Sequence, residues 1–259
     1  MKASDQTRDI ESYAQEYMNA EFEETMVQIR KRKLLAVTEP FRHQRVLEIG
    51  CGMDSIGNSL RGCEELTIVE PSSRFLHKAR EDSAAWQNVV LHFVHGFFEE
   101  QTEVLSRNSY DLILISSLLH EVCDSDRFLL SVRSLCDTST TVHVNVPNAL
   151  SFHRLLGLES GLISSLETLS PRNARLQQRN VYTLKTLKAL LGAAGDIQVC
   201  DEGSYFIKPL THEQMQFCFQ HQLFDPRVLK GLEGMVRYMP EYGAEIYVNF
   251  RFKNVPVRN

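Results

Sequence analysis

The sequence predicts an α/β fold, a doubly wound and mostly parallel sheet of seven strands with an antiparallel last strand. Two observations support this prediction. First, five short apolar runs alternate with helical segments between residues 45 and 146, which is typical of a parallel sheet with helices on both faces. Second, two later runs, 196–210 and 244–254, can supply the remaining strands, and the second of them alternates strongly between apolar and polar residues.

The elements follow from the spacing of apolar residues. Residues 8–36 place aromatic and aliphatic side chains at near-helical spacing, and Pro40 ends that stretch. The expected strands are 45–49, 66–69, 89–94, 111–115 and 141–146, and the helices between them are 55–61, 72–83, 98–106 and 124–135. After Pro147 the alternation breaks, and residues 148–180 and 210–240 are predicted to be helical insertions that form a cap. We therefore expect a helical lid at 1–40 and one domain at 41–259.

Composition limits the function classes. The chain has 259 residues and a net charge of -5, which argues against a nucleic-acid surface because such surfaces usually need a basic stripe. The basic run 30–33 is predicted to be a solvated helix face. The six cysteines contain no C-x-x-C pair, as expected for thiols in a reducing compartment. No signal peptide or membrane-length apolar stretch is present, so we expect a cytoplasmic protein without a membrane partner.

The stretch E-I-G-C-G, residues 48–52, places two glycines where a strand gives way to a helix. Glycines have no Cβ, so main-chain N–H groups there can approach a ligand closely. Glu70 lies 18 residues beyond Gly52, at the end of the next apolar run, where a carboxylate can accept hydrogen bonds from both hydroxyls of a ribose. Dinucleotide-binding oxidoreductases and S-adenosylmethionine methyltransferases both use such an arrangement.

E-I-G-C-G, followed by I-V-E-P and Y-D-L-I-L, resembles the class I S-adenosylmethionine-dependent methyltransferases over about residues 45–146. The resemblance implies a Rossmann-like sheet and S-adenosylmethionine as the cofactor. Residues 147–157 also resemble a segment of methyltransferases of polysaccharide and small natural-product pathways. The residues that the resemblance and the strand ends assign to cofactor binding are Glu48, Gly50, Cys51, Gly52, Glu70, Pro71, Gly96, Phe97, Phe98, Ser116 and Ser117.

The catalytic candidates lie beyond the fourth and fifth strands. His120 is the first candidate base, because an imidazole with a pKa near neutrality suits proton removal, and His153 is the second. Tyr13, Tyr17, Asn148 and Arg154 are candidates for substrate contacts. Each of these residues has a structural alternative: the histidines and Arg154 can pin their segments to the sheet, and the tyrosines can pack as ordinary apolar residues. No metal site is expected, since no carboxylate after the fifth strand matches Asp124 and Asp126.

The sequence thus predicts an enzyme that transfers a methyl group to a small-molecule acceptor, with oxygen favoured as the nucleophile. A nicotinamide-dependent oxidoreductase is disfavoured by Ser55, which stands where that fingerprint needs a third glycine, and by the absence of a Tyr-x-x-x-Lys pair. A cofactor-binding regulatory protein without catalysis remains the third interpretation. The apolar residues of 210–240 either form a packed helix pair or contribute to a homodimer.

Overall fold

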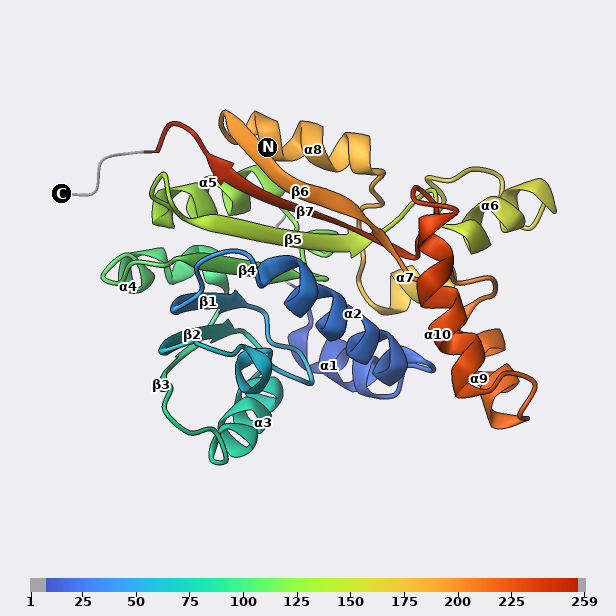
Figure 1. Ribbon diagram of the computed structural model, residues 1–259, viewed down its shortest axis with the longest axis horizontal. Helices are drawn as coiled ribbons and strands as arrows, with labels where there is room; N and C mark the ends of the chain where they lie inside the picture. Colours follow the sequence, from blue (N-terminus) through green and yellow to red (C-terminus); the bar gives the residue numbers. More distant parts are fainter. Residues whose placement is uncertain (1–7, 256–259) are drawn as a thin grey trace.

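The sheet has seven strands in the order β3-β2-β1-β4-β5-β7-β6 in the computed structural model, which describes residues 8–255 (Figure 1). The strands are β1 (Arg45–Ile49), β2 (Glu65–Glu70), β3 (Val90–His95), β4 (Leu112–Ser116), β5 (Thr141–Pro147), β6 (Ile197–Tyr205) and β7 (Glu245–Phe252). β1 to β5 pair in parallel, whereas β7 runs antiparallel to both β5 and β6. The predicted fold class is confirmed, and the strand order reverses between β1 and β4.

Ten α-helices and three 3₁₀ turns accompany the strands within the same described range. The helices are α1 (Ile10–Met18), α2 (Glu23–Thr38), α3 (Ser73–Ser83), α4 (Thr102–Leu105), α5 (Ser125–Leu135), α6 (Phe152–Glu159), α7 (Pro171–Arg175), α8 (Leu184–Ala193), α9 (His212–Gln220) and α10 (Pro226–Gly234). The turns are η1 (Gly57–Ser59), η2 (Phe98–Glu100) and η3 (Met235–Arg237). Among these helices, none is long and apolar enough to cross a membrane.

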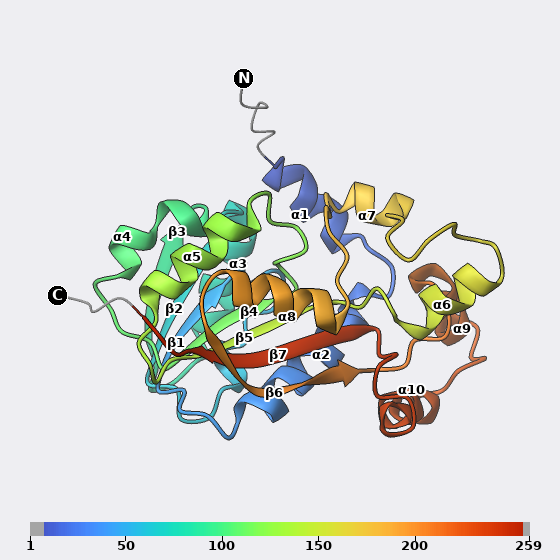
Figure 2. The same cartoon turned by 90° about the horizontal axis from the view of Figure 1, so that it is seen from above.

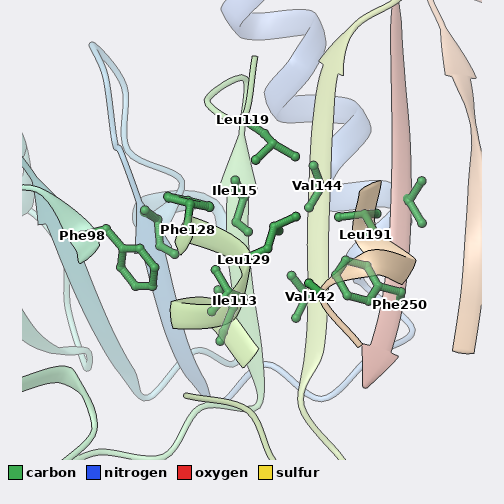
Figure 3. Packing of buried hydrophobic residues seen from close by; sticks show 14 of the residues in the cluster. Phe98, Ile113, Ile115, Leu119, Phe128, Leu129, Val142, Val144, Leu191 and Phe250 are labelled. Atoms are coloured by element: carbon green, nitrogen blue, oxygen red, sulfur yellow. The ribbon is translucent and has the colours of Figure 1, made fainter. Parts of the chain in front are cut away.

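The two faces of the sheet carry separate cores, because neighbouring residues of a strand point to opposite faces. On one face, side chains of β4, β5 and β7 pack against α5 and α8, as Figure 3 shows for Ile113, Val142 and Phe250 with Leu129 and Leu191. The opposite face is covered by α1, α2 and α3. Val46 of β1 belongs to that second core, whereas the next residue, Leu47, belongs to the first.

The N-terminal helices and the later insertions meet beyond one end of the sheet. In Figure 1 the arrowhead of β5 points toward α7 and α10, and in Figure 2 α1 and α7 lie side by side. Phe22 and Met26, at the start of α2, pack in a third cluster with Met215 of α9 and Phe206. The carboxyl ends of the central strands are therefore enclosed by elements from both ends of the chain. Residues 1–7 of the expected lid and 256–259 of the expected domain lie outside the described residues.

Two predicted helices are wrong in extent. The expected helix 55–61 is only the 3₁₀ turn η1, because Ser55 and the Ile56 N–H are bonded to Glu48 and Leu60 is already extended. Its residues include Gly57 and Asn58, which are poor helix formers. The expected helix 98–106 divides into η2 and the single turn α4, because the backbone leaves helical geometry at Gln101, with φ -103 and ψ 3.

Candidate active site

A cavity of about 310 Å³ lies at the carboxyl ends of β1, β2 and β4 and beneath α1. This is the position at which open α/β sheets bind ligands, where the strand order reverses. Twelve of the residues singled out from the sequence line it: Tyr13, Tyr17, Glu48, Gly50, Cys51, Gly52, Glu70, Pro71, Phe97, Phe98, Ser116 and Ser117. The lining thus gathers residues from the lid helix and from the loops after four strands.

The loop after β1 is built from left-handed backbone. Gly50 has φ +76 and Gly52 has φ +54, a region that side chains with a Cβ rarely adopt. A Cβ on Gly50 would lie 3.3 Å from Leu118 Cδ2, whereas one on Gly52 would have no heavy atom within 4 Å. Gly50 is therefore favoured by its conformation and stands in tight contact with Leu118, whereas the Gly52 main chain is open on the side where a side chain would stand.

Glu48 holds the far end of this loop, at Ser55 and Ile56. Its carboxylate, which is 6% exposed, accepts hydrogen bonds from the Ser55 hydroxyl and, at 3.0 Å, from the Ile56 N–H. Burial raises the pKa of Glu48 to about 7, although both hydrogen bonds favour the charged form. The carboxyl group therefore changes charge near neutral pH, at the floor of the cavity.

Glu70 joins the end of β2 to the glycine loop. Its two oxygens accept from the Ser72 N–H at 2.9 Å and from the Gly52 N–H at 3.4 Å, and Cys51 Sγ lies 3.8 Å away. Burial raises the pKa of Glu70, while the main-chain donors oppose that shift. The sequence predicted a carboxylate one strand away from the glycines, and the two are in direct contact here.

The segment after β3 contributes aromatic surface. Phe97 and Phe98 both line the cavity, but Phe98 is buried and its ring packs 5.1 Å from that of Phe128, so it belongs to the core as well. Gly96 has φ +140, and a Cβ there would stand 2.7 Å from Gln101 Nε2. Gly96 therefore shapes the turn that presents Phe97 and is not itself part of the lining.

The loop after β4 carries a buried acid that sequence reasoning missed. Glu121 lines the cavity, is 2% exposed, and accepts from Arg8 at 2.7 Å and from the Tyr13 hydroxyl at 3.1 Å. Burial raises the pKa of Glu121 to about 7. A sequence cannot tell which of two adjacent polar residues after a strand faces the cavity, and the pattern indicated only His120 there.

His120 lies behind this acid. Its ring is fully buried and does not line the cavity, and among the described residues neither ring nitrogen has a hydrogen-bond partner. Nε2 lies 3.6 Å from Glu121 Oε1, and burial lowers the pKa of His120 to about 3. The imidazole is therefore neutral at neutral pH, with a carboxyl group adjacent to it.

The lid tyrosines are held by charged partners. The rings of Tyr13 and Tyr17 stack with centroids 5.6 Å apart, and the Tyr17 hydroxyl donates to Glu23 at 2.9 Å. Arg30, which also lines the cavity, donates to Glu245 at 2.6 Å and to Glu23 at 3.4 Å. The prediction of a solvated face for 30–33 is wrong at Arg30, which is 8% exposed because its partners lie on the sheet side of α2.

The other predicted site residues lie outside the cavity lining. Asn148 donates to the carbonyl oxygens of Glu241 and Gly243 at 2.8 and 2.9 Å, which ties β5 to the start of β7. Arg154 donates to the carbonyl oxygens of Leu166 and Thr168 and so closes the loop after α6. His153 lies in the cap near Lys208 and Arg154, and burial lowers its pKa well below the usual value.

The arrangement can bind a polar ligand through main-chain amides and carboxylates. Among residues 8–255 no group of three His, Cys, Asp or Glu side chains could hold a metal ion. The sequence comparison is consistent with this site: a family model described as "Methyltransferase domain" matches residues 15–195. No curated protein gives a significant match to the chain.

Solved structures share the fold at low identity. The plantazolicin methyltransferase BamL, solved with a triazolic desmethylPZN analog and SAH, is 16% identical over 96% of this chain and 87% of its own, with a TM-score of 0.52. The N-methyltransferase NodS from Bradyrhizobium japonicum WM9, in complex with S-adenosyl-L-homocysteine, is 12% identical over 95% and 98%, with a TM-score of 0.56. An S-adenosylmethionine-dependent methyltransferase from Mesorhizobium loti is 15% identical over 83% and 95%, with a TM-score of 0.54.

Proposed function

Because the chain belongs to the methyltransferase-domain family, as a class I S-adenosylmethionine-dependent methyltransferase, we propose that it methylates an oxygen nucleophile of a small-molecule acceptor. The observation that carries the proposal is the contact between Glu70 and the Gly52 N–H at the floor of the cavity. This contact brings a carboxylate and the open glycine loop to one place, as a ligand with a ribose and an amino-acid tail requires.

The residues present fit the cofactor. S-adenosylmethionine supplies, when bound, a methyl group on a sulfonium sulfur, which a nucleophile takes by in-line displacement. Gly50, Cys51 and Gly52 would face its methionine part, and Glu70 with Pro71 would hold the ribose hydroxyls. Phe97 has its ring available at the cavity wall for stacking on the base. Solved neighbours with bound SAH support this assignment.

Proton removal from the acceptor is assigned to the pair His120 and Glu121. Glu121, which lines the cavity, would accept the proton of the acceptor hydroxyl, and the neutral imidazole of His120, whose Nε2 is 3.6 Å from Glu121 Oε1, would act behind it as a positioning residue. Glu121 itself, with a pKa of about 7, lies on the cavity side of the pair. This order, acid toward the cavity and imidazole behind it, supports a hydroxyl acceptor.

The acceptor would enter between the lid and the cap. Tyr13 and Tyr17 of α1 cover the cavity, and the helices of the segments 148–180 and 210–240 lie at the end of the sheet toward which the β5 arrowhead points (Figure 1). We assign the substrate contacts to these elements, including His153, Arg154 and Asn148 on the cap side. All six cysteines are unpaired, which supports a reducing, cytoplasmic setting for the reaction.

A homodimer through α9 and α10 is part of the same proposal. Met215 is buried and Phe219 is packed against the core, but Phe217 of α9, Met235 of η3 and Tyr238 just after η3 are exposed. Exposed large apolar side chains in and just after this helix pair favour contact with another surface. Light scattering coupled to size-exclusion chromatography tests it: a mass of one chain at all accessible concentrations would rule the dimer out.

Calorimetric titrations with S-adenosylhomocysteine and with NADH test the cofactor. We expect S-adenosylhomocysteine to bind with one site per chain and NADH not to bind; the reverse result would exclude a methyltransferase. Transfer of a labelled methyl group from S-adenosylmethionine to a panel of hydroxylated and carboxylated small molecules then separates an enzyme from a binding protein without catalysis.

His120→Asn tests the pair. We expect kcat to fall by roughly 100-fold or more, with the affinity for S-adenosylhomocysteine unchanged. The matched control is His77→Asn on α3, where the imidazole is exposed and paired only with Glu81. Equal turnover in both variants would remove His120 from the reaction.

A further inference from the structure

Glu23 lies between the cavity and a second polar cluster on the cap side. One of its oxygens accepts from the Tyr17 hydroxyl at 2.9 Å, and Tyr17 lines the cavity. The other oxygen accepts from Arg172 of α7 at 2.7 Å, on the cap side. A group within reach of Arg172 therefore lies one carboxylate away from the cavity.

Lys208 lies in that cluster without an acidic partner. Its side chain is 2% exposed, and its Nζ donates to Nδ1 of His212 at 2.8 Å, which requires a neutral imidazole. Within the described part of the chain, no carboxylate forms an ion pair with Lys208. Burial and the nearby Arg172 lower its pKa to about 7, although Glu23 and Glu245, which form no ion pair with it, act in the opposite direction. A buried ammonium held only by a neutral acceptor is costly, unless an anion is supplied from outside.

The neighbouring groups add positive charge and unused donors. Arg154 lies close enough to lower the pKa of His153, and both residues come from α6. Arg154 Nε and His153 Nδ1 are buried and have no hydrogen-bond partner among the described residues. The nearby acid, Glu23, is already shared among Arg30, Arg172 and His212, and Glu245 is taken by Arg30. The cluster thus has more cationic groups than carboxylates.

The cluster is also reachable. The side chains of Arg172 and His212 are 24% and 18% exposed, whereas Lys208 is buried behind them. Four segments of the cap supply these groups: α6, α7, the loop before α9, and the first residue of α9. Such convergence of donors from separate elements is typical of a binding site for a small polar group.

We propose that the cap cluster of Lys208, Arg172, His212, His153 and Arg154 binds an anionic oxygen group, a carboxylate or a phosphate ester, carried by the acceptor. The inference rests on the proposed function, since it defines the class of molecule that is methylated. The anionic group would supply the missing partner for Lys208 and would anchor the acceptor on the cap side of Glu23, with its nucleophile toward the cavity.

Titration calorimetry with inorganic phosphate, and separately with acetate, at constant ionic strength set by chloride tests the site. We expect saturable binding of at least one of the two at one site per chain, and affinity at least ten-fold weaker in Lys208→Met. The matched control is Lys230→Met, the same change at an exposed lysine of α10, which should bind within two-fold of the unchanged chain. Preference for phosphate or for acetate identifies the anionic group.

Affinity for S-adenosylhomocysteine, measured on the same samples, separates the anion site from the proposed function. Lys208 does not line the cofactor cavity, so Lys208→Met should keep that affinity, which also shows that the variant is folded. Should Lys208→Met not fold, Arg172→Gln serves instead, with weakened anion binding expected. If the chain binds S-adenosylhomocysteine but neither anion, or binds an anion equally well in both cluster variants, the cap site is wrong. If an anion binds and S-adenosylhomocysteine does not, the proposed function fails and the anion site remains.

Discussion

The cofactor side of the cavity and its cap side hold buried charges in opposite ways. On the cofactor side, Glu48 and Glu70 are bonded to main-chain N–H groups two to eight residues further along the chain, or to the adjacent loop. On the cap side, Arg30 meets Glu245 and Arg172 meets Glu23, pairs that are 215 and 149 residues apart. The proposed ligand-binding loop is therefore encoded locally, whereas the proposed acceptor side depends on contacts that form only in the folded chain.

The two arrangements also differ in their titration. Carboxyl groups on the cofactor side have raised pKa values, because burial outweighs neutral donors. Glu245 on the cap side has a lowered pKa, because the Arg30 guanidinium overcomes its burial. The cap side should therefore respond to mutation mainly in stability, and the cofactor side mainly in ligand affinity and its pH dependence.

Arg30→Met should produce the largest effect. It leaves Glu245 buried with only Tyr205 and Asn145 as donors, and removing one partner of a buried ion pair costs about 3–5 kcal/mol. We expect the free energy of unfolding in urea to fall by that amount. Arg32→Met, two residues away, removes an exposed pair with Glu233 and should change it by less than about 1 kcal/mol. Similar losses in the two variants would contradict the buried network.

Glu70→Ala should be next in size, and it acts on affinity. A carboxylate that accepts two hydrogen bonds from a ligand contributes about 1.5–3 kcal/mol for each bond, so affinity for S-adenosylhomocysteine should fall by at least roughly 100-fold. The control is Glu64→Ala, which removes an exposed acid just before the opposite end of β2. Unchanged affinity in Glu70→Ala, measured by calorimetry, would remove the ribose assignment.

The sequence predicted the sheet well because its strands are local apolar runs. β1 has the expected bounds, 45–49, and the other strands of the parallel half differ from theirs by one residue at one or both ends. It failed at the helix 55–61, since Glu48 binds the Ser55 hydroxyl and the Ile56 N–H, and at Arg30, whose partner Glu245 lies on the last strand. Glu121 and Lys208 were missed for the same reason: only the folded chain shows that they are buried beside other charges.

The pH dependence of cofactor affinity tests the raised pKa of Glu48 on the cofactor side, and its expected effect is smaller than that of Glu70→Ala. Without ligand, Glu48 keeps its proton up to a pH of about 7, because burial raises its pKa. An ammonium group bound above the glycine loop would favour the carboxylate, so binding should release a proton below that pH. Affinity for S-adenosylhomocysteine should therefore rise by roughly ten-fold from pH 6 to pH 8.

Titration calorimetry in buffers of different ionisation enthalpy measures the released proton directly. Glu48→Gln, which keeps the shape of the protonated group, should abolish most of the release. Glu99→Gln changes another cavity-lining carboxyl group with a raised pKa and should retain it. Equal proton release in both variants would move the linkage away from Glu48.

Gly→Ala substitutions should have the smallest effects on the free energy of unfolding, with opposite signs in the two regions. Gly50→Ala on the cofactor side forces a Cβ into left-handed backbone at φ +76, against Leu118, and should destabilise the fold by about 1–2 kcal/mol. Gly231→Ala in the middle of α10 meets nothing within 4 Å and should stabilise it by about 0.5–1 kcal/mol, since alanine is the better helix former. Urea unfolding of the two variants checks both signs. Stabilisation by Gly50→Ala would mean that the loop after β1 is not left-handed. Its main-chain amides would then not be open to a ligand in the proposed way.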